Sequence, residues 1–388
     1  MDHFQASTLA RGHRTRTPRA RLSRARLALL AWLAALAGCG PPASATHEEP
    51  LLNIYNWSDY IGKTTIADFE RATGIRVNYD TYDADNALEA KMLSGGTGYD
   101  VVTTSNDFFS RQIKASVYRR LDRGKLPNWK YLDPEVLRVL EPADPGNRYA
   151  APYLRSNNGF AYNVDMVRAR MPDAPVDSLD MLFKPEVISR FADCGVQFLD
   201  SPGDVLSMAL SYCGLDPNTR RPEDFKAAEQ LVMAVRRYVR SFASVGYINS
   251  LVNREICIAM SWSSDYATAL ARARAVGIDI HLAFTLPKEG SNRSFDAWLI
   301  PADAPHPEAA LRFINFMLDP KVIAAVTNDI YYANANRGAD AYVNPDIIGN
   351  PVLYPPAAAQ ARMYDNLEVD HATERVRTRA WTRIKTGH

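Results

Sequence analysis

The chain has 388 residues, 47% of them hydrophobic and 23% charged, which is the composition of an ordinary globular protein large enough for two lobes. Its 45 basic and 44 acidic residues nearly balance, but residues 1–27 alone hold seven arginines and only one acid, Asp2. The rest of the chain has 38 basic and 43 acidic residues, a net charge of −5, which excludes the basic surface that nucleic acid requires and weakly favours a cationic partner.

The basic N-terminal segment precedes an apolar run at 27–37 that ends in Leu36-Ala37-Gly38-Cys39. This run is too short to span a bilayer, and its order is that of an export signal. A disordered basic tail with a chance apolar patch is the alternative. Leu-Ala-Gly-Cys resembles the lipobox of bacterial lipoproteins, which implies that residues 1–38 are a signal peptide and that Cys39 is lipidated. Residues 39–49 then form a flexible tether.

The next part of the chain alternates predicted strands and helices. We expect strands at 51–55, 75–79 and 100–103, a helix at 63–72 that stops at Gly74, and a helix at 87–93 that stops at Gly95-Gly96. This rhythm is typical of a parallel α/β sheet, whose ligands bind beyond the carboxyl ends of the strands. Ser58, Asp59 and Ser105 lie just past such strand ends.

An extended stretch at 149–164 suits a crossover into a second lobe, where another α/β rhythm runs from about 176 to 284. Residues 294–300 form a returning strand, and 309–318 and 320–326 are helical. A chain that crosses between lobes more than once forms a hinged clamp. We expect the first lobe to contain 51–155 and about 296–322, and the second to contain 156–295 and about 323–388.

Motifs of catalysis and cofactor binding are missing from the sequence. It has no G-x-S-x-G, no H-E-x-x-H and no Walker loop, and no Cys or His spacing that makes a metal site. We therefore predict neither an enzyme nor a cofactor or metal. With Cys39 lipidated, Cys194, Cys213 and Cys257 remain; export makes a disulfide reasonable, and three thiols leave one unpaired.

Aromatic residues recur beside acids where the pattern predicts loops. The instances are Trp57-Ser58-Asp59-Tyr60, Trp262-Ser263-Ser264-Asp265, Phe295-Asp296, and Tyr331-Tyr332 near Asn334 and Asn336. Singly, each is more simply a core aromatic or a turn residue. Together they suit an alkyl-ammonium ion, which has donors and no acceptor and needs carboxylates, hydroxyls and aromatic faces around it.

Eight segments then carry a resemblance to a known family. They are IYNWSDYIG (54–62), SGGTGYDVV (94–102), LDRGKLPNW (121–129), FAYNVD (160–165), YINSLVNREICIAMSW (247–262), YYANANR (331–337), YPP (354–356) and RVRTRAWTRIK (375–385). The chain resembles the putrescine/spermidine-binding periplasmic proteins of bacterial ABC transporters. The resemblance implies an α/β, two-lobed type II periplasmic-binding-protein fold with a hinge. It also implies a monomeric periplasmic receptor that captures a polyamine and delivers it to membrane permease subunits.

The resemblance further assigns roles to individual positions. It implies aromatic walls from Trp57, Tyr60, Trp262 and Tyr332, polar contacts from Ser58, Asp59 and Ser105, one ammonium site at Asp265 and Asp296, and the other at Asp204. Ser294 stands where the family has a stacking aromatic and Asp107 where it has a small residue; with Ser201 and Asn366 they are candidate specificity positions. The family's paired cysteines imply a Cys194–Cys257 disulfide, with Cys213 free at a helix end where a thiol can be buried.

Two alternatives remain open from the sequence. The same fold also binds ferric ion through paired tyrosines, which Tyr331-Tyr332 fit superficially, although iron favours oxygen anions over tryptophans. The other is a polyamine-binding sensor that signals to a membrane partner, because the importer's remaining subunits are separate chains.

Overall fold

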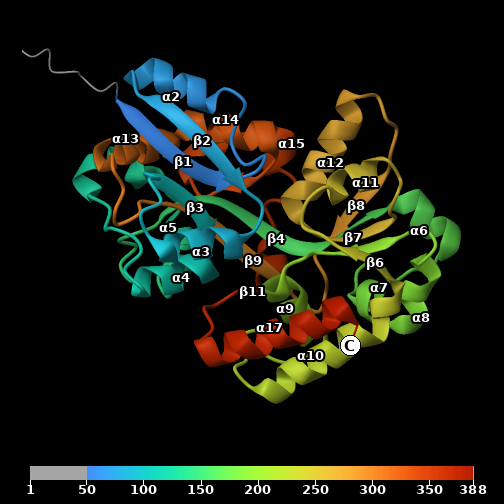
Figure 1. The fold of residues 1–388 in the computed structure, drawn as a ribbon. Coiled ribbons are helices and arrows are strands. Elements are labelled where there is room, and N and C mark those ends of the chain that lie inside the picture. The colour runs from blue at the N-terminus through green and yellow to red at the C-terminus, as the bar shows by residue number, and fades with distance from the viewer. Residues whose placement is uncertain (1–49, 388) are drawn as a thin grey trace, which may run out of the picture. The chain divides into compact units, whose positions relative to one another are not determined.

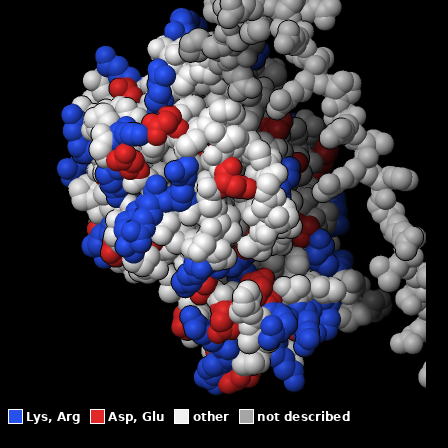
Figure 2. Space-filling view, turned by 60° about the vertical axis from the view of Figure 1, so that its left-hand side comes forward, with Lys and Arg blue, Asp and Glu red and all other residues white. Residues whose placement is uncertain are grey.

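The computed structural model describes residues 50–387. The predicted signal peptide, Cys39 and the whole of the predicted tether lie outside the described residues. Within 50–387 no helix is both long enough and apolar enough to cross a membrane. Figure 2 shows basic and acidic side chains interspersed around an area of uncharged ones on the face that it presents.

The first sheet begins with three parallel strands, as predicted. They are β1 (Leu51–Trp57), β2 (Arg76–Tyr82) and β3 (Val101–Ser105), joined by helices α2 (Thr65–Thr73) and α3 (Asp85–Ser94), with α4 (Asn106–Lys114) after β3. Gly74 ends α2 in the left-handed conformation, with φ +71°, and its N–H bonds back to the carbonyl of Glu70. The strand ends at Trp57 and Ser105 therefore lie at one edge of the sheet (Figure 1).

Two long strands cross the molecule and make the sheet mixed. Strand β9 (Ser291–Leu299) pairs antiparallel with β3 and with the first part of β4 (Ala151–Asn163), and the second part of β4 pairs antiparallel with β7 (Ile258–Trp262) and β8 (Leu282–Thr285). With β5 (Val196–Phe198) and β6 (Val239–Phe242), the strand order is β2-β1-β3-β9-β4-β7-β5-β6. The parallel arrangement predicted for the first three strands is therefore confirmed, and the returning strand β9 adds an antiparallel neighbour to β3.

The remaining strands extend this sheet, and the remaining helices pack around it (Figure 1). The other strands are β10 (Ala333–Asn334) and β11 (Met363–Asp365). The other helices are α5 (Pro134–Leu140), α6 (Val164–Arg170), α7 (Asp180–Phe183), α8 (Pro185–Ile188), α9 (Pro202–Tyr212), α10 (Pro222–Val235), α11 (Tyr247–Val252), α12 (Ser263–Ala275), α13 (Pro307–Met317), α14 (Pro320–Ile330), α15 (Pro345–Ile348), α16 (Ala357–Gln360) and α17 (His371–Thr386). Five short 3₁₀ segments complete the described part.

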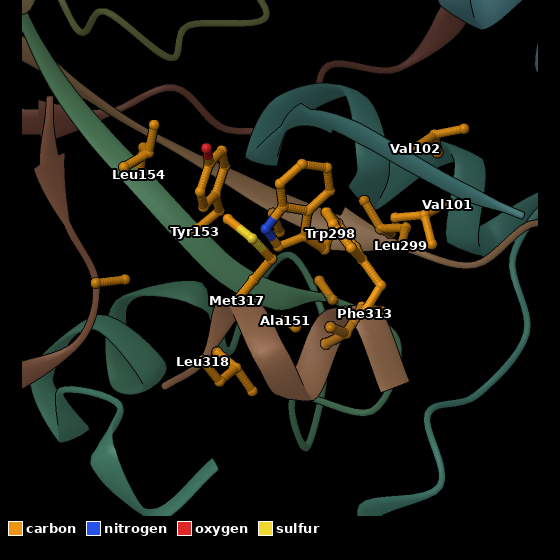
Figure 3. Packing of buried hydrophobic residues seen from close by; sticks show 14 of the residues in the cluster. Val101, Val102, Ala151, Tyr153, Leu154, Trp298, Leu299, Phe313, Met317 and Leu318 are labelled. Carbon is orange, nitrogen blue, oxygen red and sulfur yellow. The ribbon is translucent and has the colours of Figure 1, made fainter. Parts of the chain in front are cut away.

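Two separate hydrophobic cores make the described chain two-lobed. In the first, the Trp298 ring packs against Tyr153 and Phe313, with ring centroids 4.4 and 5.2 Å away (Figure 3). The second contains Phe183, whose ring meets that of Phe198 edge to face. Each lobe thus has a hydrophobic core of its own, packed against its half of the sheet.

The C-terminal part of the chain is divided between the lobes differently from our expectation. We placed the chain after about residue 323 in the second lobe, but Ile323 and Val326 of α14, Ile347 of α15 and Leu353 are buried in the first core. Of the described chain after residue 323, only α17 contributes buried side chains to the second core. A short loop connects α13 to α14, so the apolar face of α14 packs against the core of the lobe that contains α13.

The cysteines pair as the resemblance implied. A disulfide joins Cys194 to Cys257, with Cα atoms 5.5 Å apart. It ties the segment just before β5 to the residue before β7. Cys213 is free, as predicted, but it is exposed and not buried. It caps the end of α9, one turn beyond Leu210, which is the last buried residue of that helix.

Candidate functional site

Three aspartates are buried in the described chain near the strands that the lobes share. Asp204 lies in the first turn of α9, Asp265 in the first turn of α12, and Asp296 in the middle of β9; their exposed fractions are 8%, 8% and 9%. A buried carboxylate is costly unless a counter-charge or several donors accompany it. Carboxylates buried in this way are candidates for a functional site.

Asp265 and Asp296 form one end of the site, which we call the paired end. The Tyr60 hydroxyl donates to Asp296 over 2.6 Å, and the Tyr332 hydroxyl donates to Asp265 over 2.7 Å. The Tyr247 hydroxyl donates to the second oxygen of Asp265. Because the Tyr60 and Tyr332 rings meet edge to face with centroids 4.7 Å apart, both carboxylates belong to one aromatic enclosure.

Burial raises the pKa of both carboxyls at the paired end. The pKa of Asp296 rises to about 6, since burial and the charges of Asp107 and Asp204 outweigh the hydrogen bond from Tyr60. Burial also raises the pKa of Asp265, against the opposing effect of its two tyrosine donors. Burial thus outweighs the stabilising contacts at both carboxyls, and the charge of Arg272 opposes the rise at Asp265 only in part.

The same environment keeps the Tyr332 phenol protonated. Burial first, and then the Asp265 charge, raise the pKa of Tyr332 well above its ordinary value. A tyrosine that binds ferric ion does so as phenolate, which this site disfavours strongly. The hydroxyl of Tyr332 instead serves as a donor to Asp265. The geometry thus weighs against the iron alternative.

Asp204 forms the opposite end, which we call the single end. The Asn292 amide donates to Asp204 over 2.9 Å, and the Asn366 amide donates over 3.4 Å. Ser201 caps α9 by accepting from the backbone N–H of Asp204. Burial raises the pKa of Asp204, while Ser201, Asn158 and Asn292 oppose the rise. Two of the candidate specificity residues, Ser201 and Asn366, are therefore neighbours of this carboxylate.

A further acidic group lies near Asp296. The Ser105 hydroxyl donates to Asp107 over 2.8 Å and lies 3.4 Å from Asp85, which also accepts from Thr104 over 3.0 Å. In the antiparallel register Ser105 stands directly opposite Asp296. Burial raises the pKa of Asp85 strongly, and the charges of Asp107, Asp296 and Asp204 raise it further. The part of the site near Asp296 is thus rich in carboxylates.

Strand β9 runs along the floor of the site. Asn292, Ser294 and Asp296 alternate with residues of the other face, so their side chains share one face. Asn292 contacts the single end through Asp204, and Asp296 belongs to the paired end. Ser294 lies between them and is only partly buried. This order places Ser294 at the centre of the floor.

The predicted tryptophans occupy the ends of two strands. Trp57 is the last residue of β1, is half-buried and packs against the Tyr82 ring with centroids 4.4 Å apart. Trp262 is the last residue of β7, is half-buried and stands directly before the helix that carries Asp265. A half-buried indole is the kind of aromatic wall that attracts a cationic ligand.

Two predicted contacts lie away from the buried carboxylates. Ser58 and Asp59 are exposed in the turn after β1, where Asp59 adopts a left-handed backbone with φ +57°. The Arg272 guanidinium donates to Asp59 over 2.9 Å, and the Asp59 side chain is 82% exposed. This pair joins the turn after β1 to α12 across the lobes. The position of this ion pair indicates that it links the two lobes rather than contacting the ligand.

Sequence reasoning missed several polar residues of the site. Asp85 follows the carboxyl end of β2, so the rule that we applied to the first and third strands would have found it. Tyr247 begins the segment at 247–262 that carries the family resemblance, but no local pattern distinguishes it from a core tyrosine. Asn158 and Asn292 lie on crossing strands, and their position at the floor depends on strand register.

In the described chain no cluster of three His, Cys, Asp or Glu has the arrangement of a metal site.

Comparison with known proteins agrees with this geometry. The model of the bacterial extracellular solute-binding protein family matches residues 64–353. The chain is 43% identical to the putrescine-binding periplasmic protein PotF of Escherichia coli (strain K12), over 88% of this chain and 92% of the relative. It is 39% identical to a putrescine/agmatine-binding protein of Pseudomonas aeruginosa, over 89% and 94%. The chain therefore belongs to the bacterial extracellular solute-binding protein family.

The same relationship extends to solved structures. A putative spermidine/putrescine ABC transporter protein from Listeria monocytogenes superimposes with a TM-score of 0.78 at 27% identity, covering 87% of this chain and 99% of that one. The predicted two-lobed periplasmic-binding-protein fold is thus confirmed. Since the family consists of solute-binding proteins, the chain is a receptor and not an enzyme.

Proposed function

We propose that this protein is the polyamine receptor of an ABC importer. The observation that carries the proposal is a site with buried carboxylates at both ends, aromatic walls between them, and raised pKa values that a bound cation would relieve. A linear polyamine supplies an ammonium group for each end and methylene groups for the aromatic faces. The names of the relatives described above support the same ligand class.

The proposed roles follow the two ends of the site. Asp265 and Asp296 hold one terminal ammonium, with Tyr60 and Tyr332 orienting their oxygens. Asp204 holds the other, and Trp57 and Trp262 cover the carbon chain. Ser105 contributes from the first lobe. Because the side chain of Asp59 is paired with Arg272, we assign that pair to holding the lobes together in the closed form.

The remaining parts of the proposal concern cellular context. We propose that the exported chain is anchored in the periplasm through a lipid on Cys39, acts as a monomer and delivers its ligand to membrane permease subunits. The leader pattern and the periplasmic relatives support this assignment. No observation on the described residues favours the sensor alternative over import, so we do not propose it.

Titration calorimetry on the mature chain tests the ligand class. We expect putrescine or a longer polyamine to bind, and a thermal-shift measurement should show the stabilisation that follows from binding only the native state, about 2.7 kcal/mol at a hundred times the dissociation constant. Small-angle scattering with saturating ligand should show a smaller radius as the lobes close. Absence of binding by every amine tested, with binding of an iron chelate, would reject the proposal.

A further inference from the structure

Tyr247 lies behind the paired end, inside the second lobe. It is the first residue of α11 and follows Gly246, whose φ of +80° turns the chain into that helix. The Tyr247 side chain is 2% exposed and belongs to the second core, so a ligand has almost no surface of it to touch. A tyrosine in an apolar core needs partners for its hydroxyl, and the partners found here belong to the site.

The Tyr247 hydroxyl contacts side chains on both sides of Trp262. It donates to Asp265 in the first turn of α12, and it lies 3.1 Å from the hydroxyl of Ser261, the residue before Trp262 on β7. The Ser261 hydroxyl also lies 2.9 Å from the carbonyl oxygen of Trp262, which can accept its proton. One buried phenol therefore ties together the strand end and the helix start that carry an aromatic wall and a carboxylate of the site.

The two tyrosines that donate to Asp265 come from different lobes. Tyr332 packs against the first core beside Tyr60, whereas Asp265 lies on α12, which packs against β7, β8 and α11. The hydrogen bond from Tyr332 therefore crosses between the lobes and forms only while they are closed. The hydrogen bond from Tyr247 lies within the second lobe, so it does not depend on closure.

Groups on four elements act on the charge of Asp265. Burial raises its pKa most, the hydrogen bond from Tyr247 is the largest of the influences that lower it, Tyr332 and Arg272 lower it less, and the charge of Asp59 raises it. Burial, and then the charge of Asp265, raise the pKa of Tyr247 well above its ordinary value, so the phenol stays protonated and remains a donor. When the lobes separate, Tyr332 and Asp59 leave with the first lobe, and Tyr247 and Arg272 stay with the carboxylate.

We propose that Tyr247 is a positioning residue of the receptor, which holds the Asp265 carboxylate in its binding orientation while the lobes are open. Tyr332 adds its hydrogen bond to the same carboxylate only on closure. This inference rests on the polyamine function proposed above. A carboxylate that is already fixed loses little freedom when an ammonium group binds to it, and this favours affinity. Because Tyr247 also contacts Ser261, it fixes the end of β7 and with it the wall formed by Trp262.

Tyr247→Phe removes the hydroxyl and keeps the buried ring. Titration calorimetry on the full mature chain should show putrescine and spermidine binding about ten- to a hundredfold more weakly at pH 7, because a hydrogen bond to a charged group is lost. Tyr212→Phe is the matched control, since the Tyr212 hydroxyl also donates to a carboxylate of the second lobe, that of Asp180, over 2.6 Å. This control should bind within about twofold of wild type. A loss below about twofold in Tyr247→Phe overturns the inference.

The pH dependence of binding distinguishes positioning from a purely structural role. Removing the Tyr247 donor raises the pKa of Asp265 further, so in Tyr247→Phe binding should begin to weaken at a pH about half a unit or more above that of wild type. A hydroxyl that only stabilised the core would leave this profile where it is. Titrations between about pH 8 and about pH 5 measure the profile, and Tyr212→Phe should keep that of wild type. An unchanged profile in Tyr247→Phe overturns the inference.

A double-mutant cycle tests whether Tyr247 acts through Asp265. Added to Asp265→Ala, Tyr247→Phe should weaken binding by less than about twofold more; losses that multiply in full overturn the inference. If Tyr247→Phe does not fold, Ser261→Ala serves in its place and should weaken binding about two- to fivefold, and wild-type affinity in Ser261→Ala overturns the inference. Wild type is titrated in the same series. If neither amine binds to it, the proposed function itself fails.

Discussion

Replacing Asp296 by Asn should change stability and binding in opposite directions. In the empty protein the pKa of Asp296 is about 6 against an ordinary value of 3.8, chiefly because of burial. This difference corresponds to about 3 kcal/mol by which the folded chain disfavours the ionised form. Asn carries no charge, and its oxygen can still accept from Tyr60. We expect the empty variant to be about 1–3 kcal/mol more stable than wild type at pH 7.

The pH dependence gives the same prediction a sign that can be checked. The folded-state pKa of Asp296 lies above the unfolded-state value, so its ionisation destabilises the empty protein as the pH rises from about 4 to about 6. Wild type should therefore gain stability as the pH falls through that window, and the gain should be smaller in Asp296→Asn. A bound ammonium favours the carboxylate, so affinity in wild type should weaken below about pH 6.

Binding should suffer while stability improves. Removing one partner of a buried charge pair typically costs about 2–5 kcal/mol, which is a loss of about 30-fold to several thousandfold in affinity. Melting curves of the empty proteins at pH 7, 6 and 5, with calorimetric titration of putrescine and spermidine, measure both effects. Asp173→Asn is the control for an exposed acid. A variant that melts below wild type at pH 7 and binds within about twofold of it would show that Asp296 only anchors Tyr60, and would refute this reasoning.

Three more predictions test the neighbouring features. Asp265→Asn should weaken binding by a similar factor while the chain stays folded, because the remaining amide oxygen still accepts from one of the two tyrosines, Tyr247 or Tyr332; unchanged affinity by calorimetry would move the site elsewhere. Arg272→Ala should change affinity by less than about fivefold, since exposed ion pairs contribute at most about 1 kcal/mol; a larger loss would make the Asp59 pair part of the binding energy. Replacing Cys194 and Cys257 together by Ser opens a bridge between residues 63 apart and should lower the free energy of unfolding by about 2–4 kcal/mol in denaturant melts, with reduced wild type as the control; a loss no larger than experimental error would contradict this.

Local patterns in the sequence predicted the parts of the fold that depend on short-range signals. The strand at 51–55 and the helix at 63–72 correspond to β1 and α2, because alternation and the glycine at 74 act within a few residues. The antiparallel direction of β9 could not be predicted in this way, since it depends on which lobe the chain leaves. The position of α14 depends on tertiary packing, which favours the first core.

The candidate site was predictable to the extent that residue type and strand ends define it. Asp265 and Asp296 carry aromatic neighbours in sequence, and the structure brings them together through Tyr60 and Tyr332. Asp204 has no local signal, and only the family resemblance indicated it. Asn158 and Asn292 become floor residues through the register of two long strands, which no local pattern encodes.

The two crossing strands have a consequence for the order of events in capture. Asn292, Ser294 and Asp296 share one face of a single strand, so their spacing is fixed by the backbone and does not depend on how far the lobes are apart. We expect a cation arriving from solvent to bind first to this fixed row of side chains. The walls from β1 and α12 then add their contacts as the lobes close. The on-rate should then depend on the charge of the floor and fall with ionic strength. Residence time should depend on the aromatic walls, so the two rates can evolve separately.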